Sequence, residues 1–231
     1  MTPSEIPRVV DVNQIKCIHF GRVAIFSSTR LLIALVKFRP FTTITGVKVN
    51  QWAELSQFLL CKRKFTYPIA KNGTSLEGFM FAIGWPKCST KNKQFGLYRS
   101  LRKIENTKDE WRNQCANLSF VGCILGKSLQ YVGDKLFQKI QTFYKSLVIP
   151  SFDQVNYEAN ISANKGEFEF ASALTFTING FKNSPHLDKD ASLYNLGWWC
   201  QADKQTGQIQ RHATRWCTRG RLIFPNEHFL D

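Results

Sequence analysis

The most regular pattern of apolar positions in the chain lies at residues 128–147. Its apolar side chains recur at intervals of three and four residues, which is the spacing of one helix face. These side chains are Leu129, Val132, Leu136, Ile140, Phe143 and Leu147. Pro150 is expected to end the helix, because proline cannot continue the backbone hydrogen bonds. We interpret the stripe as facing the protein core rather than a partner.

Two more helices are predicted in the amino-terminal half. Residues 51–62 have helical spacing, and Asn50 is suited to cap them. Their shared apolar face consists of Trp52, Leu55 and Leu59. Farther along, Thr107 and Glu110 have the spacing of a capping box, in which a hydroxyl and a carboxylate bind the free N–H groups at a helix start.

After Pro150 the pattern changes to the two-residue period of β-strands. Residues 167–179 alternate almost strictly between apolar and polar side chains, which predicts a strand with one buried face. The apolar positions are Phe168, Phe170, Leu174, Phe176 and Ile178. Asn179 and Gly180 then predict a turn.

Further strand candidates are short apolar runs bounded by turn residues. They are residues 23–26, 31–36, 78–85, 94–98, 193–202 and 220–225. We expect residues 94–98 to pair back against 78–85, and residues 203–207 to form a hairpin loop after 193–202. The predicted fold class is therefore α+β, with amino-terminal helices supporting an antiparallel double-sheet jelly roll. Residues 1–48 form a poorly defined amino-terminal segment.

The charge of the chain adds a partner to this picture. Its 231 residues include 31 Lys and Arg against 17 Asp and Glu, for a net charge of +14. A polyanion is the natural partner, with nucleic acid ahead of a membrane surface. A solvated basic surface is an equally open interpretation, because the cations are spread along the chain. The longest aliphatic run, residues 31–36, is too short to span a bilayer, and no pattern points to oligomerisation.

The seven cysteines point to a compartment rather than to a site. Their number is odd, no CxxC spacing occurs, and no secretory signal is recognised at residues 1–13. We expect free thiols in a reducing intracellular compartment, with the nucleus favoured over the cytoplasm.

His186 and Asp188 are the strongest candidates for site chemistry. Side chains two residues apart on an extended backbone point the same way, so the pair can supply two ligands to one metal. An imidazole and a carboxylate are part of the 2-His-1-carboxylate set that holds Fe(II) in oxygenases. Lys189 and Asp190 are placed to orient these ligands by hydrogen bonds. A solvated loop is the alternative, because the pattern is short.

Other residue sets are weaker candidates. His212, in a basic stretch, resembles an exposed loop residue, and His228 a turn residue, so neither is assigned as the second histidine. A zinc site from Cys200, His212 and Cys217 matches no common spacing. A cysteine nucleophile is possible by composition, but no motif supports one.

A resemblance to a known family rests on several longer runs. They are residues 78–89, 95–98, 154–160, 185–192, 196–199, 202–207 and 224–227. Together they resemble the Tet-like 2-oxoglutarate/Fe(II) oxygenase domain of fungi, over roughly residues 50–231. Residues 49–231 are accordingly expected to form this domain.

The resemblance implies a double-stranded β-helix and an oxidation that uses Fe(II), O₂ and 2-oxoglutarate. Relatives oxidise the methyl group of 5-methylcytosine or thymine in nucleic acid, which agrees with a basic chain. His186 and Asp188 match the first histidine and the carboxylate of the family's metal site. No catalytic residue beyond these ligands is assigned.

The family pattern continues beyond the point where this sequence ends, at Asp231. The resemblance places the distal histidine and the basic residue that grips 2-oxoglutarate there. We therefore expect an incomplete domain whose final strands are missing and whose oxygenase activity is weak or absent. The alternatives are a non-catalytic basic module that binds nucleic acid and a degenerate family member.

Overall fold

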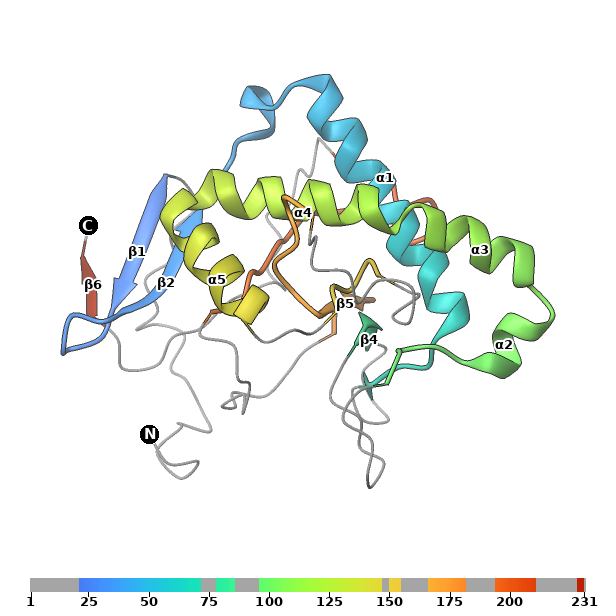
Figure 1. Ribbon diagram of the computed structural model, residues 1–231. Helices are drawn as coiled ribbons and strands as arrows, with labels where there is room; N and C mark the ends of the chain where they lie inside the picture. The colour runs from blue at the N-terminus through green and yellow to red at the C-terminus, as the bar shows by residue number, and fades with distance from the viewer. Residues whose placement is uncertain are drawn as a thin grey trace.

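The structure, a computed structural model, describes residues 21–71, 78–85, 96–146, 150–154, 166–181, 194–210 and 228–230. Helices cross over two small antiparallel sheets (Figure 1), so the mixed helix and strand composition is confirmed. The described strands form two three-stranded sheets, ordered β2-β1-β6 and β3-β4-β5. Their closure into a jelly roll stays a prediction.

The elements follow one another in this order. They are β1 (Arg22–Phe26), β2 (Leu32–Lys37), η3 (Phe41–Thr43), α1 (Gly46–Lys62), η4 (Arg63–Phe65), β3 (Ala70–Lys71), β4 (Phe79–Gly84), α2 (Leu101–Glu105), α3 (Lys108–Ala116), α4 (Leu118–Val132), α5 (Asp134–Ser146), β5 (Ala173–Ile178) and β6 (His228–Leu230). None of the helices in these ranges is long and apolar enough to cross a membrane.

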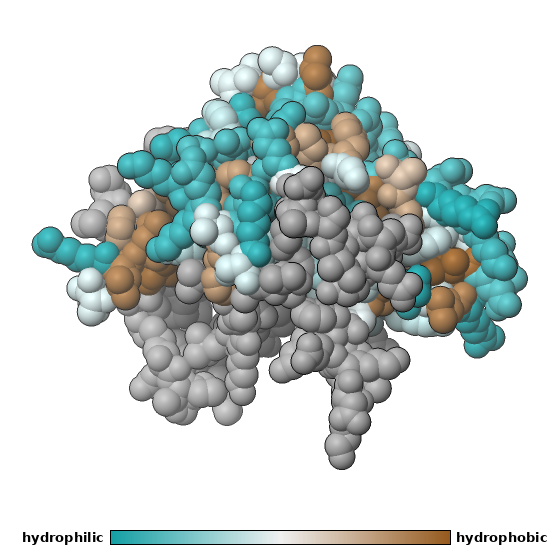
Figure 2. Space-filling model, viewed as in Figure 1, coloured by the Kyte–Doolittle hydropathy of each residue, from teal (hydrophilic) through white to brown (hydrophobic). Residues whose placement is uncertain are grey.

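Strands β1 and β2 confirm two of the short apolar runs as strands. Ile25 of the first run is buried, whereas Leu31, Leu32 and Ile33 of the second run are exposed. Figure 2 shows hydrophobic residues at this hairpin, on the left. Strand β6 pairs with β1, so the backbone of His228 lies in a strand opposite Phe26 rather than in a turn.

Strands β4 and β5 form the antiparallel pair at the centre of the second sheet. The register joins Phe79 to Ile178 and Gly84 to Ala173, and the rings of Phe81 and Phe176 stack with centroids 5.5 Å apart. The predicted strand at residues 78–85 is confirmed, while the one predicted at 167–179 is restricted to β5. Within β5 the alternation holds, because Phe176 is buried between two exposed threonines.

The residues before β5 alternate for another reason. Phe168 and Phe170 both pack on Phe137 of α5, with ring centroids 6.5 Å apart in each case. The Gln141 side chain donates to the carbonyl oxygens of Glu167 and Glu169. Phe168 and Phe170, which the sequence assigned to a strand, therefore pack against helix α5 instead.

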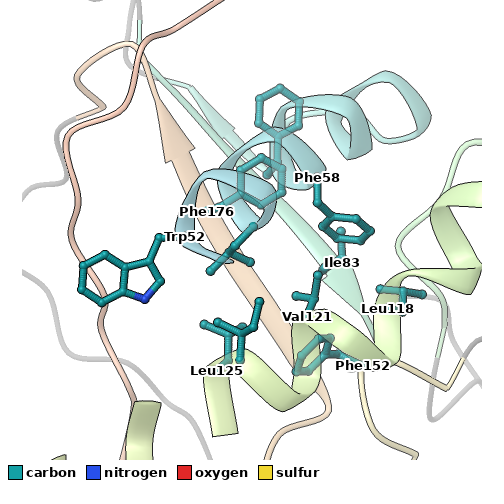
Figure 3. Close-up of a cluster of buried hydrophobic side chains, with 11 residues drawn as sticks. Trp52, Phe58, Ile83, Leu118, Val121, Leu125, Phe152 and Phe176 are labelled. Carbon is teal, nitrogen blue, oxygen red and sulfur yellow. The ribbon is translucent and has the colours of Figure 1, made fainter. Parts of the chain in front are cut away.

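The core lies between this sheet and helices α1 and α4. Figure 3 shows its side chains converging from α1, α4 and the two strands. They include Trp52, Leu55, Phe58, Phe81, Ile83, Leu118, Val121, Leu125, Phe152 and Phe176. The predicted helix at residues 51–62 is present but starts earlier, at Gly46. Thr45 caps it by accepting a hydrogen bond from the Lys48 N–H, and Asn50 lies inside the helix.

Gly133 interrupts the helix that was predicted at residues 128–147. Its φ of −164° and ψ of 98° are extended, and they separate α4 from α5. The apolar stripe is consequently split between two helices. The buried side chains of α5 are Phe137 and Tyr144, which the stripe did not contain.

The predicted capping box marks the right helix start but does not form. Thr107 precedes α3, but its hydroxyl donates to the carbonyl oxygen of Lys103 at 2.9 Å. The carboxylate of Glu110 instead accepts a hydrogen bond from Lys64 at 2.7 Å. The Glu110 carboxylate joins α3 to η4.

Two other strand predictions differ from the structure. Residues 96–98 lie in no strand, and Tyr98 makes one backbone hydrogen bond to Gly84. Residues 194–201 also lie in no strand, although the bridge between Ala202 and Ile209 confirms the predicted hairpin. The strand predicted at residues 220–225 lies outside the described residues.

Truncating a leucine in this core is expected to destabilise the protein strongly. Leu55 is 1% exposed, so Leu55→Ala should leave a cavity and cost about 2–5 kcal/mol in free energy of unfolding. Leu101 is 68% exposed, and Leu101→Ala should cost no more than about 0.5 kcal/mol. Urea unfolding followed by circular dichroism measures both. Equal losses would contradict the assignment of the core.

Candidate functional site

The chain turns sharply where β5 ends and leads toward the expected iron ligands. Asn179 and Gly180 have φ values of 56° and 66°, and this left-handed backbone is one that asparagine and glycine adopt most readily. The predicted turn is thus confirmed. His186 and Asp188 follow a few residues later and lie outside the described residues, so their role as ligands stays a prediction.

The chain is described again from Tyr194, and contacts fasten it to the helices. The Lys139 ammonium of α5 lies 5.8 Å from the centroid of the Tyr194 ring. Trp198 packs edge-on against Trp52 of α1, with centroids 5.8 Å apart and an angle of 66° between the rings. The described residues that follow the His186 and Asp188 pair in the sequence therefore contact the core and its helices.

The hairpin at residues 203–207 is built by its own hydrogen bonds. The Asp203 carboxylate accepts from the N–H groups of Gln205 and Thr206 and from the Thr206 hydroxyl. These bonds lower the pKa of Asp203, with those from Thr206 contributing most. Gly207 has a φ of 73° and lies against Gln57 of α1. A Cβ at position 207 would be 2.9 Å from the backbone nitrogen of Gln57. The acid of this hairpin thus shapes the turn.

The cysteine alternatives gain no support from the structure. Burial raises the pKa of Cys200 to about 11, so its sulfur stays a protonated thiol near neutral pH. His212 and Cys217, the other members of the conceivable zinc site, lie outside the described residues. Among the described residues, no group of three or more His, Cys, Asp or Glu side chains is close enough to hold a metal ion.

Lys62 is a buried amine that the sequence did not reveal. Lys62 is the last residue of α1 and is only 2% exposed. Its Nζ lies 3.9 Å from the centroid of the Trp111 ring. The ammonium also donates a hydrogen bond to the Cys115 sulfur, 3.9 Å away. Burial lowers the pKa of Lys62 to about 8 and raises that of Cys115. Lys62 sits beside Arg63 and Lys64, so in the sequence it looks like one of a basic run.

The surroundings of Lys62 do not form an open site. The adjoining hollow is lined by apolar and aromatic groups that include Ile83, Tyr98 and Phe152. The aromatic ring of Trp111 compensates part of the cost of burying the charge. We interpret Lys62 as a structural cation beneath α3.

Replacing Lys62 should change how stability depends on pH. The folded-state pKa, about 8, is below the ordinary value of 10.5, so the unfolded chain binds more protons between those values. Wild-type stability should therefore rise with pH from about 8, by an amount on the order of 1–3 kcal/mol if the shift is fully expressed. Lys62→Met should remove this rise.

The measurement is urea unfolding of both proteins between about pH 7 and pH 9. The raised pKa of Cys115 acts in the opposite direction only above its ordinary value of 9.0. The Lys62 ammonium itself lowers the pKa of Cys115, so Lys62→Met changes that pKa as well, and the two proteins are compared below pH 9. Parallel pH profiles would show that Lys62 titrates normally.

Comparison with protein families gives one match. The model of the Tet-like 2OG-Fe(II) oxygenase superfamily matches residues 45–230. No curated protein and no solved structure was found to match the chain. The match covers most of the chain and includes His186 and Asp188, so it confirms the family that the sequence runs indicated.

Proposed function

Since the chain belongs to the Tet-like 2OG-Fe(II) oxygenase superfamily, we propose that it is a 2-oxoglutarate- and Fe(II)-dependent dioxygenase acting on a methylated nucleobase in nucleic acid. His186 and Asp188 are two of the three iron ligands of this class, and no third ligand is assigned, so we expect its turnover to be weak. The observation that carries this proposal is the family match across residues 45–230, with His186 and Asp188 inside it. The helices and small antiparallel sheets are consistent with such an enzyme.

His186 and Asp188 are the residues that would hold the iron. A neutral imidazole and an ionised carboxylate are the donors that Fe(II) takes in this class of enzyme. With 2-oxoglutarate and O₂, the metal supplies the oxidising power for attack on a methyl group. The chain's own contribution would be to bring the two donors to one place, and their spacing of two residues in the sequence supports this.

The net charge supports nucleic acid as the substrate carrier. A base in a duplex reaches an active site only after it leaves the stack, and the protein must hold the phosphate backbone while this happens. A chain with a net charge of +14 is suited to such a backbone. The methylated base is the part of the proposal that the family match alone does not fix.

His186→Ala and Asp188→Ala are each expected to abolish iron-dependent turnover of 2-oxoglutarate to succinate. Removing either donor leaves too few protein ligands to hold the metal. Gln205→Ala, at an exposed position in the hairpin at residues 203–207, serves as the control and should keep most of the activity. The assay contains Fe(II), ascorbate and a methylated oligonucleotide, and succinate is measured by mass spectrometry.

Anaerobic Fe(II) binding gives a readout that does not depend on turnover. The charge-transfer absorption of the complex of Fe(II) and 2-oxoglutarate should appear with wild type and vanish with His186→Ala. Absence of both the absorption and succinate in wild type would reject the dioxygenase. The second candidate, a non-catalytic module that binds nucleic acid, would then be favoured if duplex DNA still binds, as the basic composition suggests.

A further inference from the structure

Cationic side chains from four elements gather around Tyr131. Arg22 of β1 and Lys37 of β2 are direct partners across the hairpin. The Lys37 ammonium lies 3.5 Å from the centroid of the Tyr131 ring, and the Arg39 guanidinium carbon lies 4.4 Å from it. The pKa of the Tyr131 phenol is lowered first by a hydrogen bond with Lys37 and then by the positive charges of Arg39, Lys37 and Arg22. Tyr131 is 52% exposed, so this group lies at the surface.

The group extends to helices α1 and α4. The pKa of Lys48 is lowered by burial and then by the positive charges of Arg39 and Lys127. Lys127 is exposed, and its ammonium lies 5.0 Å from the Phe168 ring centroid. Lys127 stands one turn before Tyr131 on α4, and its charge and that of Arg39 both act on Lys48, so we treat these residues as one surface, the Tyr131 cationic surface. It comprises Arg22, Lys37, Arg39, Lys48, Lys127 and Tyr131.

No carboxylate in the described ranges forms an ion pair with these cations. The ion pairs there join Lys64 of η4 to Glu110 of α3, and Arg112 to Asp109 within α3. The nearest acid along α4 and α5 is Asp134, whose oxygens accept hydrogen bonds from Gln130 and Gln138. The positive charge of the surface is therefore not neutralised by the described part of the chain.

This arrangement opposes folding stability. Like charges directly opposite each other on two strands repel, as Arg22 and Lys37 do. Lys48 stands in the first turn of α1, where the helix dipole disfavours a cation and no acidic residue compensates. Contacts with Tyr131 hold two of the side chains in place without removing their charge. An anion bound across the surface would relieve each of these repulsions.

We propose that the Tyr131 cationic surface binds the phosphodiester backbone of nucleic acid. The proposal rests on the proposed function, because it takes the carrier of the substrate base as the ligand. Several fixed cations spread over four elements suit a ligand whose negative charges repeat along its length. The ring of Tyr131 is covered by Lys37 and Arg39, so its part is to position them rather than to stack on a base.

An anionic membrane fits this surface less well. Membrane binding by a basic surface is strengthened by apolar side chains beside the cations, which enter the interface. The exposed apolar residues of the hairpin, Leu31 and Leu32, lie near its turn, at the opposite end from the Arg22 and Lys37 pair. Figure 2 shows hydrophilic side chains covering α4 and α5 on the viewed face. The apolar side chains of the hairpin are thus separated from the Arg22 and Lys37 pair by the length of its strands.

Neutralising four of these cations should weaken duplex binding and reduce its salt dependence. The test variant carries Arg22→Gln, Lys37→Gln, Arg39→Gln and Lys127→Gln. Fluorescence anisotropy with a labelled DNA duplex, repeated over a salt series, measures the affinity. The slope of log affinity against log salt should fall by about 3–4, and affinity at moderate salt should fall at least about tenfold.

A control variant loses the same charge elsewhere. It carries Arg63→Gln, Arg102→Gln, Lys108→Gln and Lys204→Gln, all at exposed positions outside the surface. Its slope should stay near that of wild type. Equal losses in the two variants, or unchanged binding in the test variant, would overturn the proposal. Loss of binding to phosphatidylserine vesicles by the test variant, with duplex binding intact, would assign the surface to membranes instead.

Folding and catalysis are read separately from binding. Circular dichroism tests whether both variants are folded. If the fourfold variant does not fold, two double variants replace it, Arg22→Gln with Lys37→Gln and Arg39→Gln with Lys127→Gln. Each double variant is expected to lower the slope of log affinity against log salt by about 2. Duplex binding through this surface without succinate formation would reject the dioxygenase and keep the surface. Succinate formation with unaltered duplex binding in the test variant would do the reverse.

Discussion

The packing of α1 and α4 against β4 and β5 is the interaction on which the remaining structure depends. Trp52, Val121 and Phe176 meet there from three elements, and burying such side chains supplies most of the driving force for folding. The described segments that precede and follow His186 and Asp188 in the sequence are connected to this core. Strand β5 carries the chain up to the Asn179 turn, and Trp52 reaches past the core to Trp198.

The segments around Asp153 and Phe168 approach α4 closely because two glycines face them there. Gly126 faces the backbone of Phe168, and a Cβ at this position would collide with its carbonyl oxygen. Gly122 similarly faces the Asp153 carboxylate, which a Cβ would approach to 2.6 Å. The absence of side chains on this face of α4 lets the segments before β5 pass directly over the helix.

The pattern of apolar residues predicted an element correctly where that element packs one face against the core. The apolar run at residues 78–85 and the alternation of residues 173–178 became paired strands because each supplies a face to the same core. The stripe through residues 128–147 misled, because the spacing of apolar residues does not register the extended backbone that Gly133 adopts. Phe168 and Phe170 show the same limit, since alternation tells which side chains are buried but not whether a strand or a helix covers them.

Some residues proposed for function could be predicted from the sequence, and others could not. The family and the His186 and Asp188 pair were predictable from contiguous residues, and the family match confirms the first of these. Lys62 and the Tyr131 cationic surface depend on segments far apart in the chain. The position of Lys62 beside Arg63 does not indicate that Trp111 and Cys115 will enclose it. In the same way, the sequence around Arg22 does not indicate that this residue will pair with Lys37 across a hairpin.

The contact between Trp52 and Trp198 also has an entropic meaning. It joins α1 to a segment that lies far along the chain, so its formation closes a long loop. The chain entropy lost in that closure is offset by the burial of the core to which Trp52 belongs. The segment at residues 194–201 is therefore fixed only in a chain whose core has already formed.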